Sequence, residues 1–279
     1  MRLLITGGSS YLGKHLVPLA IKQGHEVGYT FFENRPELPG SPLQLDLRHS
    51  QAVKQTFAQW QPEAVIHLAG SNRATDMAAV IVAGTRNVVS NLRPQSRLIN
   101  LSTDVIFNGL DAPYDESATP TPLHEYGKSK VAAEQIVAKH SNHVTVRTSL
   151  IYGLTLKDRG TEGFQTRLAA GDKLTLFNNQ YRNPVWVQSL CEACLELLTH
   201  SHRGLLHVAG SETLDRASYS MALLDFWGVT SKGQLTVGPD ESGRFPPNTR
   251  LDISLARSIL KTALPGFHDV LIRHKIPTE

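Results

Sequence analysis

The chain has 279 residues, of which 41% are hydrophobic and 19% are charged, and its formal net charge is +3. This length suits one large α/β domain or a domain with a smaller lobe, and the scattered basic residues argue against nucleic acid or a membrane as partner. No window approaches the roughly 20 apolar residues of a membrane span, and MRLLITGG is too short for a secretory signal, so we expect a cytoplasmic protein.

Short apolar runs alternate with helical patterns along the first half of the chain. Strands are predicted at 2–6, 26–32, 43–45, 64–70, 97–103 and 143–149, and helices at 11–24, 51–60, 78–92 and 125–140. Continuous apolar strands joined by helices favour a parallel sheet covered on both faces. We therefore predict an α/β fold with a Rossmann-type doubly wound parallel sheet, whose main domain comprises residues 1–150.

The alternation becomes irregular after residue 150, where long polar loops such as KDRGTEG and PDESGRFPPNT appear. We expect residues 151–279 to form mainly a smaller substrate-binding lobe against the carboxyl edge of the sheet, where such sheets bind ligands. GLLHVAG at 204–210 still has the pattern of a strand. This segment and the one around 174–190 are expected to return to the main domain.

The two cysteines, Cys191 and Cys194, have a CxxC spacing that can indicate redox or metal chemistry. Their spacing on an amphipathic helix with Leu195 and Leu198 instead favours a buried face. No further set of cysteine and histidine completes a metal site, so no metal is expected.

The segment TGGSSYLG at 6–13 follows the first strand directly and is typical of a turn that binds pyrophosphate. Backbone N–H groups at the start of a helix bind the anion, and glycines let it approach. Ser10 occupies the place of the usual middle glycine. At negative φ it costs little and its hydroxyl can donate to phosphate, whereas positive φ would strain the turn; we expect negative φ. The cofactor contacts expected in this segment are Gly7, Ser10, Tyr11, Leu12 and Gly13.

The choice between NAD and NADP is expected to depend on the segment TFFENRPE after the second strand. No acid stands at the strand end near Thr30 to accept from a ribose 2′-OH, and Arg35 can reach a 2′-phosphate, so the sequence favours NADP, with NAD as the alternative. Asp46 can accept from the adenine amino group, or it can cap the helix that follows. Further cofactor contacts are expected from Leu47, Leu68, Ala69, Gly70, Ser102, Tyr126 and Lys130.

Two segments, LSTDVIFNG at 101–109 and EYGKSK at 125–130, predict catalytic chemistry. Tyr126 and Lys130 are four residues apart, so they share one face of a helix. An adjacent ammonium favours the phenolate, and we expect it to lower the tyrosine pKa from about 10. Thr103 ends its strand where ligands bind, and its hydroxyl can hold a carbonyl or alkoxide oxygen beside Tyr126.

At this point the chain resembles the extended short-chain dehydrogenases/reductases, and within them the dTDP-4-dehydrorhamnose reductases. The likeness covers nearly the whole chain and is carried by TGGSSYLG, LQLDL, HLAG, LSTDVIFNG, PYDE, YGKSKVAAE, RTSLIYG, FNNQYRNPVWV and NTRLDISLAR. It implies hydride transfer from the nicotinamide to a 4-keto sugar attached to a nucleotide. Tyr126 would protonate the nascent alkoxide, and Thr103 would orient the carbonyl. Lys130 would bind the nicotinamide ribose, and Asp104 would contact the sugar.

Several residues depart from related patterns. Val105 stands where related 4,6-dehydratases carry a glutamate, so dehydratase activity is not expected. Ile81 replaces an asparagine that supports a proton-relay water in the wider family. Leu150 replaces a tryptophan that lines the sugar pocket in rhamnose reductases, and the loss of this aromatic surface changes which sugar face can pack. The segment from Gly70 to Gly84 is also short for the family, which predicts a more open pocket.

Two other functions stay open. One is an epimerase or another reductase of the superfamily that acts on a different small substrate. The other is a non-catalytic NADP-binding regulatory subunit resembling the methionine adenosyltransferase β-subunit, although such a regulator need not keep Thr103, Tyr126 and Lys130 together. The partner we expect is a nucleotide-sugar substrate, with a homodimer as the assembly to test.

Overall fold

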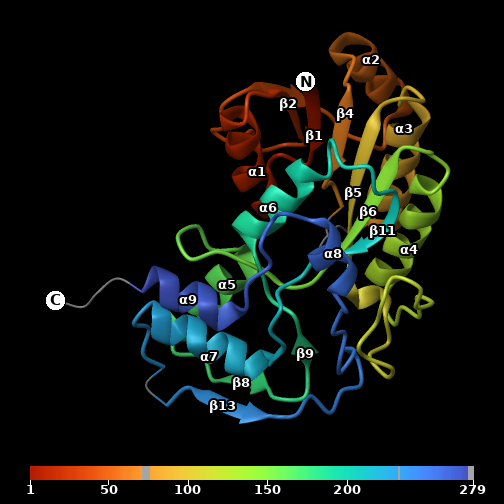
Figure 1. Ribbon diagram of the computed structural model, residues 1–279. Coiled ribbons are helices and arrows are strands. Elements are labelled where there is room, and N and C mark those ends of the chain that lie inside the picture. Colours follow the sequence, from red (N-terminus) through yellow and green to blue (C-terminus); the bar gives the residue numbers. More distant parts are fainter. Residues whose placement is uncertain (71–75, 232, 276–279) are drawn as a thin grey trace.

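The computed structural model describes residues 1–70, 76–231 and 233–275 (Figure 1). Its centre is a seven-stranded parallel sheet of order β11-β6-β5-β4-β1-β2-β3. The strands are β1 (Arg2–Thr6), β2 (Glu26–Phe31), β3 (Ser41–Gln44), β4 (Ala64–His67), β5 (Arg97–Thr103), β6 (His143–Thr148) and β11 (Gly204–His207). The strand order reverses between β1 and β4, and such a switch point is where open α/β sheets bind ligands. The predicted fold class is confirmed.

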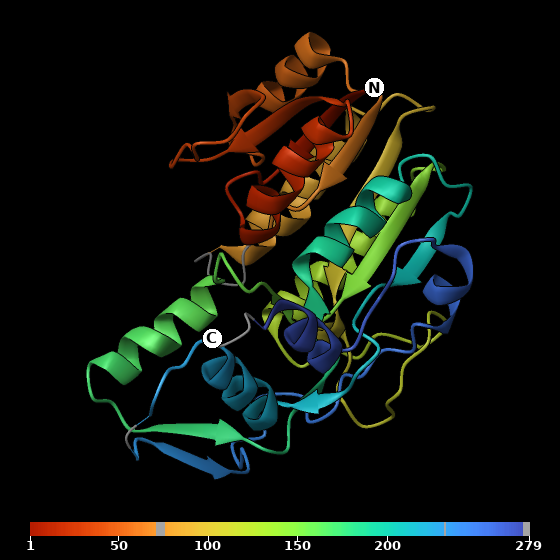
Figure 2. The same cartoon turned by 60° about the vertical axis from the view of Figure 1, so that its left-hand side comes forward.

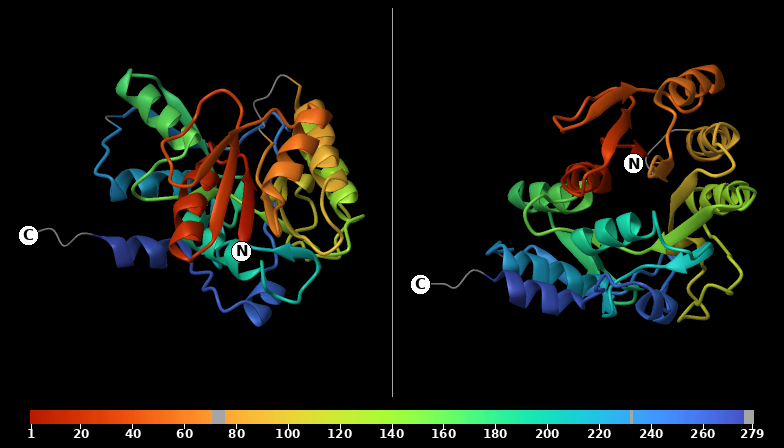
Figure 3. Two further views of the ribbon diagram at one scale, coloured as in Figure 1. Left: turned by 90° about the horizontal axis from the view of Figure 1, so that it is seen from above. Right: turned by 45° about the horizontal axis from the view of Figure 1, so that its top comes forward.

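Helices cover both faces of this sheet (Figures 1 and 3). The helices α1 (Tyr11–Lys22) and α6 (Val187–Glu196) lie on one face, and α2 (Ser50–Trp60), α3 (Gly84–Ser90) and α4 (Glu125–Val137) lie on the other. The period of two along a strand explains this arrangement. Leu3 and Ile5 of β1 pack with α1 and α6, whereas Leu4 between them packs with α2 and α3.

The second half of the chain adds short two-stranded ladders and further helices. The ladders pair β7 (Ile151–Tyr152) with β10 (Val185–Trp186), β9 (Tyr181–Arg182) with β12 (Leu214–Asp215), and β8 (Leu174–Phe177) with β13 (Leu235–Gly238). The helices are α5 (Arg159–Ala169), α7 (Arg216–Phe226), α8 (Ser254–Ile259) and α9 (Phe267–His274). Figure 2 shows α5, α7, β8 and β13 together as a separate layer beyond the end of the main sheet.

The segments expected to return to the main domain behave differently from one another. β11 forms the edge of the main sheet beside β6, and α6 packs on that sheet with α1. The strand β8 of the 174–190 segment does not return; it pairs with β13, and Leu174 packs with Leu168 and Leu224. The domain boundary at residue 150 remains a prediction.

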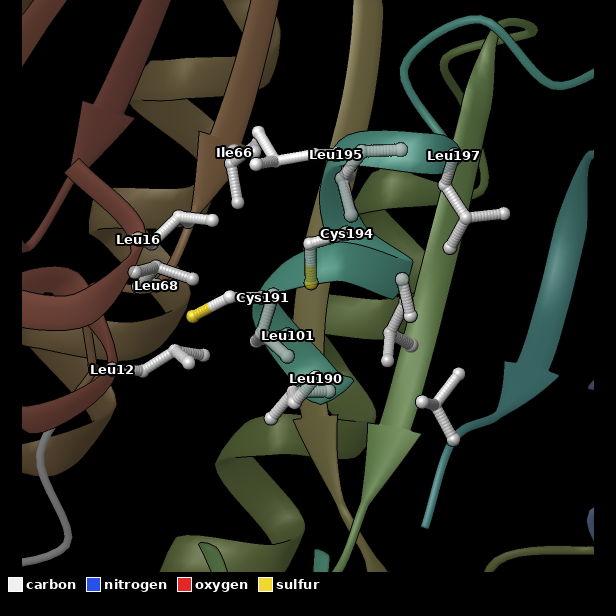
Figure 4. Close-up of a cluster of buried hydrophobic side chains, with 14 of the residues drawn as sticks. Leu12, Leu16, Ile66, Leu68, Leu101, Leu190, Cys191, Cys194, Leu195 and Leu197 are labelled. Carbon is white, nitrogen blue, oxygen red and sulfur yellow. The ribbon is translucent and has the colours of Figure 1, made fainter. Parts of the chain in front are cut away.

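Both cysteines lie in the hydrophobic core, as their spacing predicts. Figure 4 shows Cys191 and Cys194 of α6 among leucines of α1, α6 and the sheet. Burial raises the pKa of both thiols, that of Cys194 to about 12, so neither is a thiolate at neutral pH. In the described residues no group of three or more His, Cys, Asp or Glu side chains could hold a metal ion, and no helix is long and apolar enough to cross a membrane.

Candidate functional site

The turn at 6–13 places Ser10 at the N-cap of α1. Its φ is −69° and its ψ is 163°, so the backbone is extended and unstrained, as expected. The Ser10 hydroxyl oxygen accepts from the Gly13 N–H at 3.0 Å. Because this bond uses the oxygen as acceptor, the hydroxyl hydrogen is free to donate to an anion.

Backbone contacts around the turn explain its glycines. Gly7 has φ of +74°, and a Cβ at Gly13 would lie 2.6 Å from the Gly7 carbonyl oxygen. Thr30 anchors the turn to β2, because the Gly7 N–H donates to its hydroxyl oxygen at 3.0 Å and the Gly8 N–H to its carbonyl at 2.8 Å. The buried Thr30 side chain therefore supports the cofactor turn.

A cavity of about 1240 Å³ lies between this turn and the C-terminal lobe. Among the residues predicted from the sequence, its lining includes Gly7, Ser10, Tyr11, Thr30, Asp46, Leu47, Leu68, Ala69, Gly70 and Leu150. The opposite wall comes from α5, β8 and α7. Residues 71–75, part of the segment expected to leave the pocket open, lie outside the described residues.

Six predicted cofactor contacts do not line the cavity: Leu12, Gly13, Arg35 and Ser102, and also Tyr126 and Lys130 of α4. Leu12 packs in the core, and Gly13 lies against the turn with no room for a side chain. The hydroxyl of Ser102 donates to the buried Glu134, so it has a structural partner and is not turned to a ligand. Arg35 is exposed and lies outside the cavity wall, whereas Arg48, which sequence reasoning missed, is part of it.

Helix α4 presents Tyr126 and Lys130 on one face at the carboxyl end of β5. The Lys130 ammonium donates to the Leu101 carbonyl at 2.9 Å and lies 5.9 Å from the centroid of the Tyr126 ring. The ammonium is also close to Gly70, because a Cβ added at Gly70 would lie 3.3 Å from Lys130 Nζ. Neither residue lines the cavity itself. However, β5 lies between β4 and β6, and the segments that follow both of these strands do line it.

The ionisation of Tyr126 differs from the sequence prediction. Burial, reinforced by the Asp104 carboxylate, raises the pKa of Tyr126 to about 12. Burial also lowers the pKa of Lys130 to about 8, against the opposing effect of the Glu134 carboxylate. The expected lowering of the tyrosine pKa is therefore wrong, because desolvation of the phenolate outweighs the nearby ammonium. At neutral pH both groups carry their protons.

Asp104 has a structural role that the sequence did not indicate. It is only 4% exposed, and its Oδ2 accepts from Ser149 at 2.7 Å and from Thr249 at 2.8 Å. Arg182 pairs with the same oxygen at 3.7 Å. The carboxylate thus joins the end of β5 to three segments of the second half of the chain. The direct contact with sugar that the resemblance implies stays a prediction.

Thr103 begins the short turn η2 (Asp104–Ile106). Its hydroxyl oxygen accepts from the Val105 N–H at 3.4 Å and lies 3.3 Å from Asp104 Oδ1, to which the hydroxyl donates. The side chain is partly exposed, unlike Asp104. Thr103 does not line the cavity, so its contact with a substrate oxygen stays a prediction.

A buried histidine beneath Lys130 is a second residue that sequence reasoning missed. His67 ends β4, and its ring nitrogens contact the hydroxyls of Thr6 at 2.6 Å and Thr85 at 3.0 Å. Burial, aided by the charge of Lys130, lowers the pKa of His67 to about 3, so the ring stays neutral. Ile81, in the π-helical turn η1 (Ala79–Ala83), is buried against Gly70 and offers no polar side chain there.

The fold and the site define a class of protein: a doubly wound α/β protein with a glycine turn between β1 and α1 and a tyrosine–lysine pair beside the carboxyl end of β5. The RmlD substrate binding domain family matches residues 1–272, and the chain belongs to this family. The family resemblance found in the sequence is confirmed.

Individual relatives differ in what their names describe. Methionine adenosyltransferase 2 subunit beta of Rattus norvegicus is 27% identical over 91% of this chain and 80% of its own length. The dTDP-4-keto-6-deoxy-D-glucose reductase of Streptomyces niveus is 28% identical over 81% of this chain and 77% of its own. The fold matches dTDP-4-dehydrorhamnose reductase of Bacillus anthracis in complex with NADP, with a TM-score of 0.80, 22% identity, and coverage of 97% and 96%.

Proposed function

We propose that this protein is an NAD(P)H-dependent reductase of a nucleotide-activated 4-keto sugar, similar to dTDP-4-dehydrorhamnose reductase. One observation carries the proposal: Lys130 lies beside Tyr126 and donates to Leu101 of β5, the strand that Thr103 ends, and the segments that follow the two neighbouring strands line the cavity. A regulatory protein has no need of a buried lysine beside a partly buried tyrosine at this edge. The likeness to the Streptomyces niveus reductase and to the NADP complex of the Bacillus anthracis reductase supports the same reaction.

The turn at 6–13 fits a dinucleotide. Gly7 and Ser10 line the cavity at the N-terminus of α1, and side chains at Gly8 or Gly13 would collide with Tyr29 or with the backbone. This cradle of backbone N–H groups suits a pyrophosphate. When bound, the reduced nicotinamide supplies the hydride.

The chain's own groups supply the proton and the orientation. Tyr126, with its pKa raised to about 12, is fully protonated at neutral pH and is the acid that donates to the nascent alkoxide. Lys130 is protonated below about pH 8 and donates to ribose hydroxyls. Thr103 holds the carbonyl oxygen near Tyr126.

The C-terminal wall of the cavity suits the nucleotide part of the substrate. Its cationic residues are Lys157, Arg159, Arg167, Lys173 and Arg216, against the acids Asp158 and Glu162. Asp158 is further engaged as the N-cap of α5, where its Oδ1 accepts from Gly160 N at 2.8 Å. An excess of positive charge favours a diphosphate. The cytoplasmic location and the homodimer stay predictions.

A regulatory function is the second candidate, because of the 27% identity to the methionine adenosyltransferase subunit. The two functions make opposite predictions for the purified protein. A reductase oxidises NADPH when a dTDP-4-keto-6-deoxy sugar is supplied. A regulator oxidises none and instead forms a stoichiometric complex with a methionine adenosyltransferase catalytic subunit.

The deciding experiment combines turnover with cofactor binding. Tyr126→Phe should lower kcat for NADPH oxidation by roughly 10²–10⁴-fold, the usual contribution of a positioned acid, while NADPH fluorescence titration gives an unchanged Kd. Lys130→Met should lose both turnover and cofactor affinity, and Lys128→Met, at an exposed position of the same helix, should lose neither. Unchanged turnover in Tyr126→Phe would remove this residue from the mechanism.

A further inference from the structure

The loop after β3 brings an arginine to the end of β2. The parallel pairing of the two strands continues past their ends, where Leu45 N–H donates to the Phe31 carbonyl at 2.9 Å and Gln44 Nε2 donates to the Phe32 carbonyl at 3.1 Å. The loop then turns so that the guanidinium carbon of Arg48 lies 5.5 Å from the centroid of the Phe32 ring. Both side chains line the cavity.

Two neighbours, the carboxylate of Asp46 and the ring of Phe32, orient the guanidinium of Arg48. Its Nε lies 3.0 Å from both carboxylate oxygens of Asp46, and its Nη2 donates to Oδ2 at 2.7 Å. Phe32 supports one face of the planar group. Among the described residues Nη1 has no hydrogen-bond partner, and the side chain is 40% exposed. An arginine has five N–H donors in a fixed fork, so the pair with Asp46 leaves donors for a second anion.

The end of β2 places no carboxylate in the cavity wall, because the acid that follows it, Glu33, is exposed and does not line the cavity. Thr30 is committed to the glycine turn, and the next two residues, Phe31 and Phe32, are aromatic. NAD selection usually needs a carboxylate that accepts from the ribose 2′-OH at this place, and NADP selection needs an arginine. The exposed Arg35 does not line the cavity, so it is not placed for this task.

We propose that Arg48, rather than Arg35, selects NADP over NAD by binding the 2′-phosphate of the adenosine ribose. The inference rests on the proposed function, since it requires that the site takes a nicotinamide dinucleotide. Phe32 and Asp46 act as positioning residues that hold the guanidinium toward the cavity.

The acidic groups near Arg48 make its charge necessary. Asp46 is already neutralised by Arg48, and Asp76, which also lines the cavity, accepts from the Ala79 N–H at 3.0 Å and is close enough to help raise the pKa of Arg48. Without the arginine, a phosphate dianion here would face two carboxylates. Removal of Arg48 should therefore weaken the binding of NADPH, whose 2′-phosphate the carboxylates would repel, but not that of NADH, which has no charge at this position.

The test measures the Kd of NADPH and of NADH by fluorescence titration in the wild-type protein, Arg48→Gln, Arg48→Lys and Arg35→Gln. Wild type should bind NADPH more tightly than NADH. Arg48→Gln should raise the Kd of NADPH by about 10–100-fold, as expected for a lost charge-assisted hydrogen bond, and change the Kd of NADH by less than about 3-fold. Arg48→Lys should keep part of the preference, because it retains charge but loses the fork. Arg35→Gln should leave the ratio unchanged.

A second probe separates the 2′-phosphate from the rest of the cofactor. Adenosine 2′,5′-bisphosphate should displace NADPH better than adenosine 5′-monophosphate in the wild type but not in Arg48→Gln. If both dinucleotides bind and the ratio is unchanged in Arg48→Gln, or falls in Arg35→Gln instead, Arg48 is not the selector while the reductase proposal stands. If the wild type prefers NADH, the inference is overturned; if it binds neither cofactor, the proposed function fails as well.

Discussion

At the scale of single residues, Ser10 lines the cavity, and its hydroxyl oxygen accepts from Gly13 N, which leaves the hydroxyl hydrogen free to donate. Ser10→Ala should lower the free energy of unfolding by about 1 kcal/mol, because a serine N-cap is lost, and Ser10→Gly by only a few tenths. Both variants should bind NADPH a few-fold more weakly, because they lose a donor to the phosphate. Urea unfolding and fluorescence titration measure these effects. Tighter NADPH binding by Ser10→Gly would mean that the serine obstructs the turn.

The residues of the site could be found from the sequence where strand ends and helical spacing fix their places. The positions of Thr103, Tyr126 and Lys130 are of this kind, whereas their catalytic roles stay predictions. The direction of the Tyr126 pKa shift could not be predicted from the sequence, because the burial of a phenol depends on all the residues that surround it. The sequence also could not decide whether Arg35 or Arg48 lines the cavity, since this depends on how the loops after β2 and β3 fold beside each other.

At the scale of elements, the predicted sheet matches the structure closely, and the differences have local causes. The predicted strand at 43–45 is β3 at Ser41–Gln44, and the single helix predicted at 78–92 begins as the π-helical turn η1 before α3. Hydrophobic periodicity indicates an apolar face but does not distinguish a π turn from an α turn. β8 leaves the main sheet because β13, distant in sequence, pairs with it.

Helix α4 carries a third functional group, Glu134, one turn beyond Lys130. It pairs with the buried Arg147 at 2.8 Å and accepts from Ser102, next to Thr103, so it fixes α4 against β5 and β6. The reductive rate should fall above about pH 8, where Lys130 loses its proton. Because the Glu134 carboxylate raises the Lys130 pKa, Glu134→Gln should move this alkaline limb to lower pH.

The pH dependence of kcat/KM for NADPH oxidation tests this role of Glu134. Glu134→Gln should also lower stability by about 3–5 kcal/mol, because Arg147 is left as an uncompensated buried charge. Ser102→Ala is the matched control, since it removes the other partner of Glu134 without changing charge, and its alkaline limb should stay in place. If folded Glu134→Gln has the same alkaline pKa in its pH profile of kcat/KM as the wild type, Glu134 has a purely structural role.

At the scale of the whole molecule, one cavity has walls from both halves of the chain, and Tyr11 joins them. Its side chain comes from the glycine turn, and its hydroxyl donates to the Leu156 carbonyl at 2.9 Å. It also fills the space beside Gly153, which has no room for a side chain. An ordered turn around a dinucleotide should therefore order the wall that binds the second ligand.

This connection predicts positive coupling between the two ligands. NADPH and dTDP together should raise the free energy of unfolding by more than the sum of their separate contributions, each of which is about 2.7 kcal/mol at 100 times its Kd. Tyr11→Phe loses the hydrogen bond but keeps the ring, so it should bind each ligand alone nearly as well as the wild type. With both ligands, it should lose most of the stabilisation beyond the sum of the separate contributions. Tyr181→Phe, at a partly exposed tyrosine outside the cavity wall, is the control and should keep it. Denaturant unfolding with neither, either and both ligands gives the coupling free energy directly. Strictly additive contributions in the wild type would show that the two halves of the cavity bind independently.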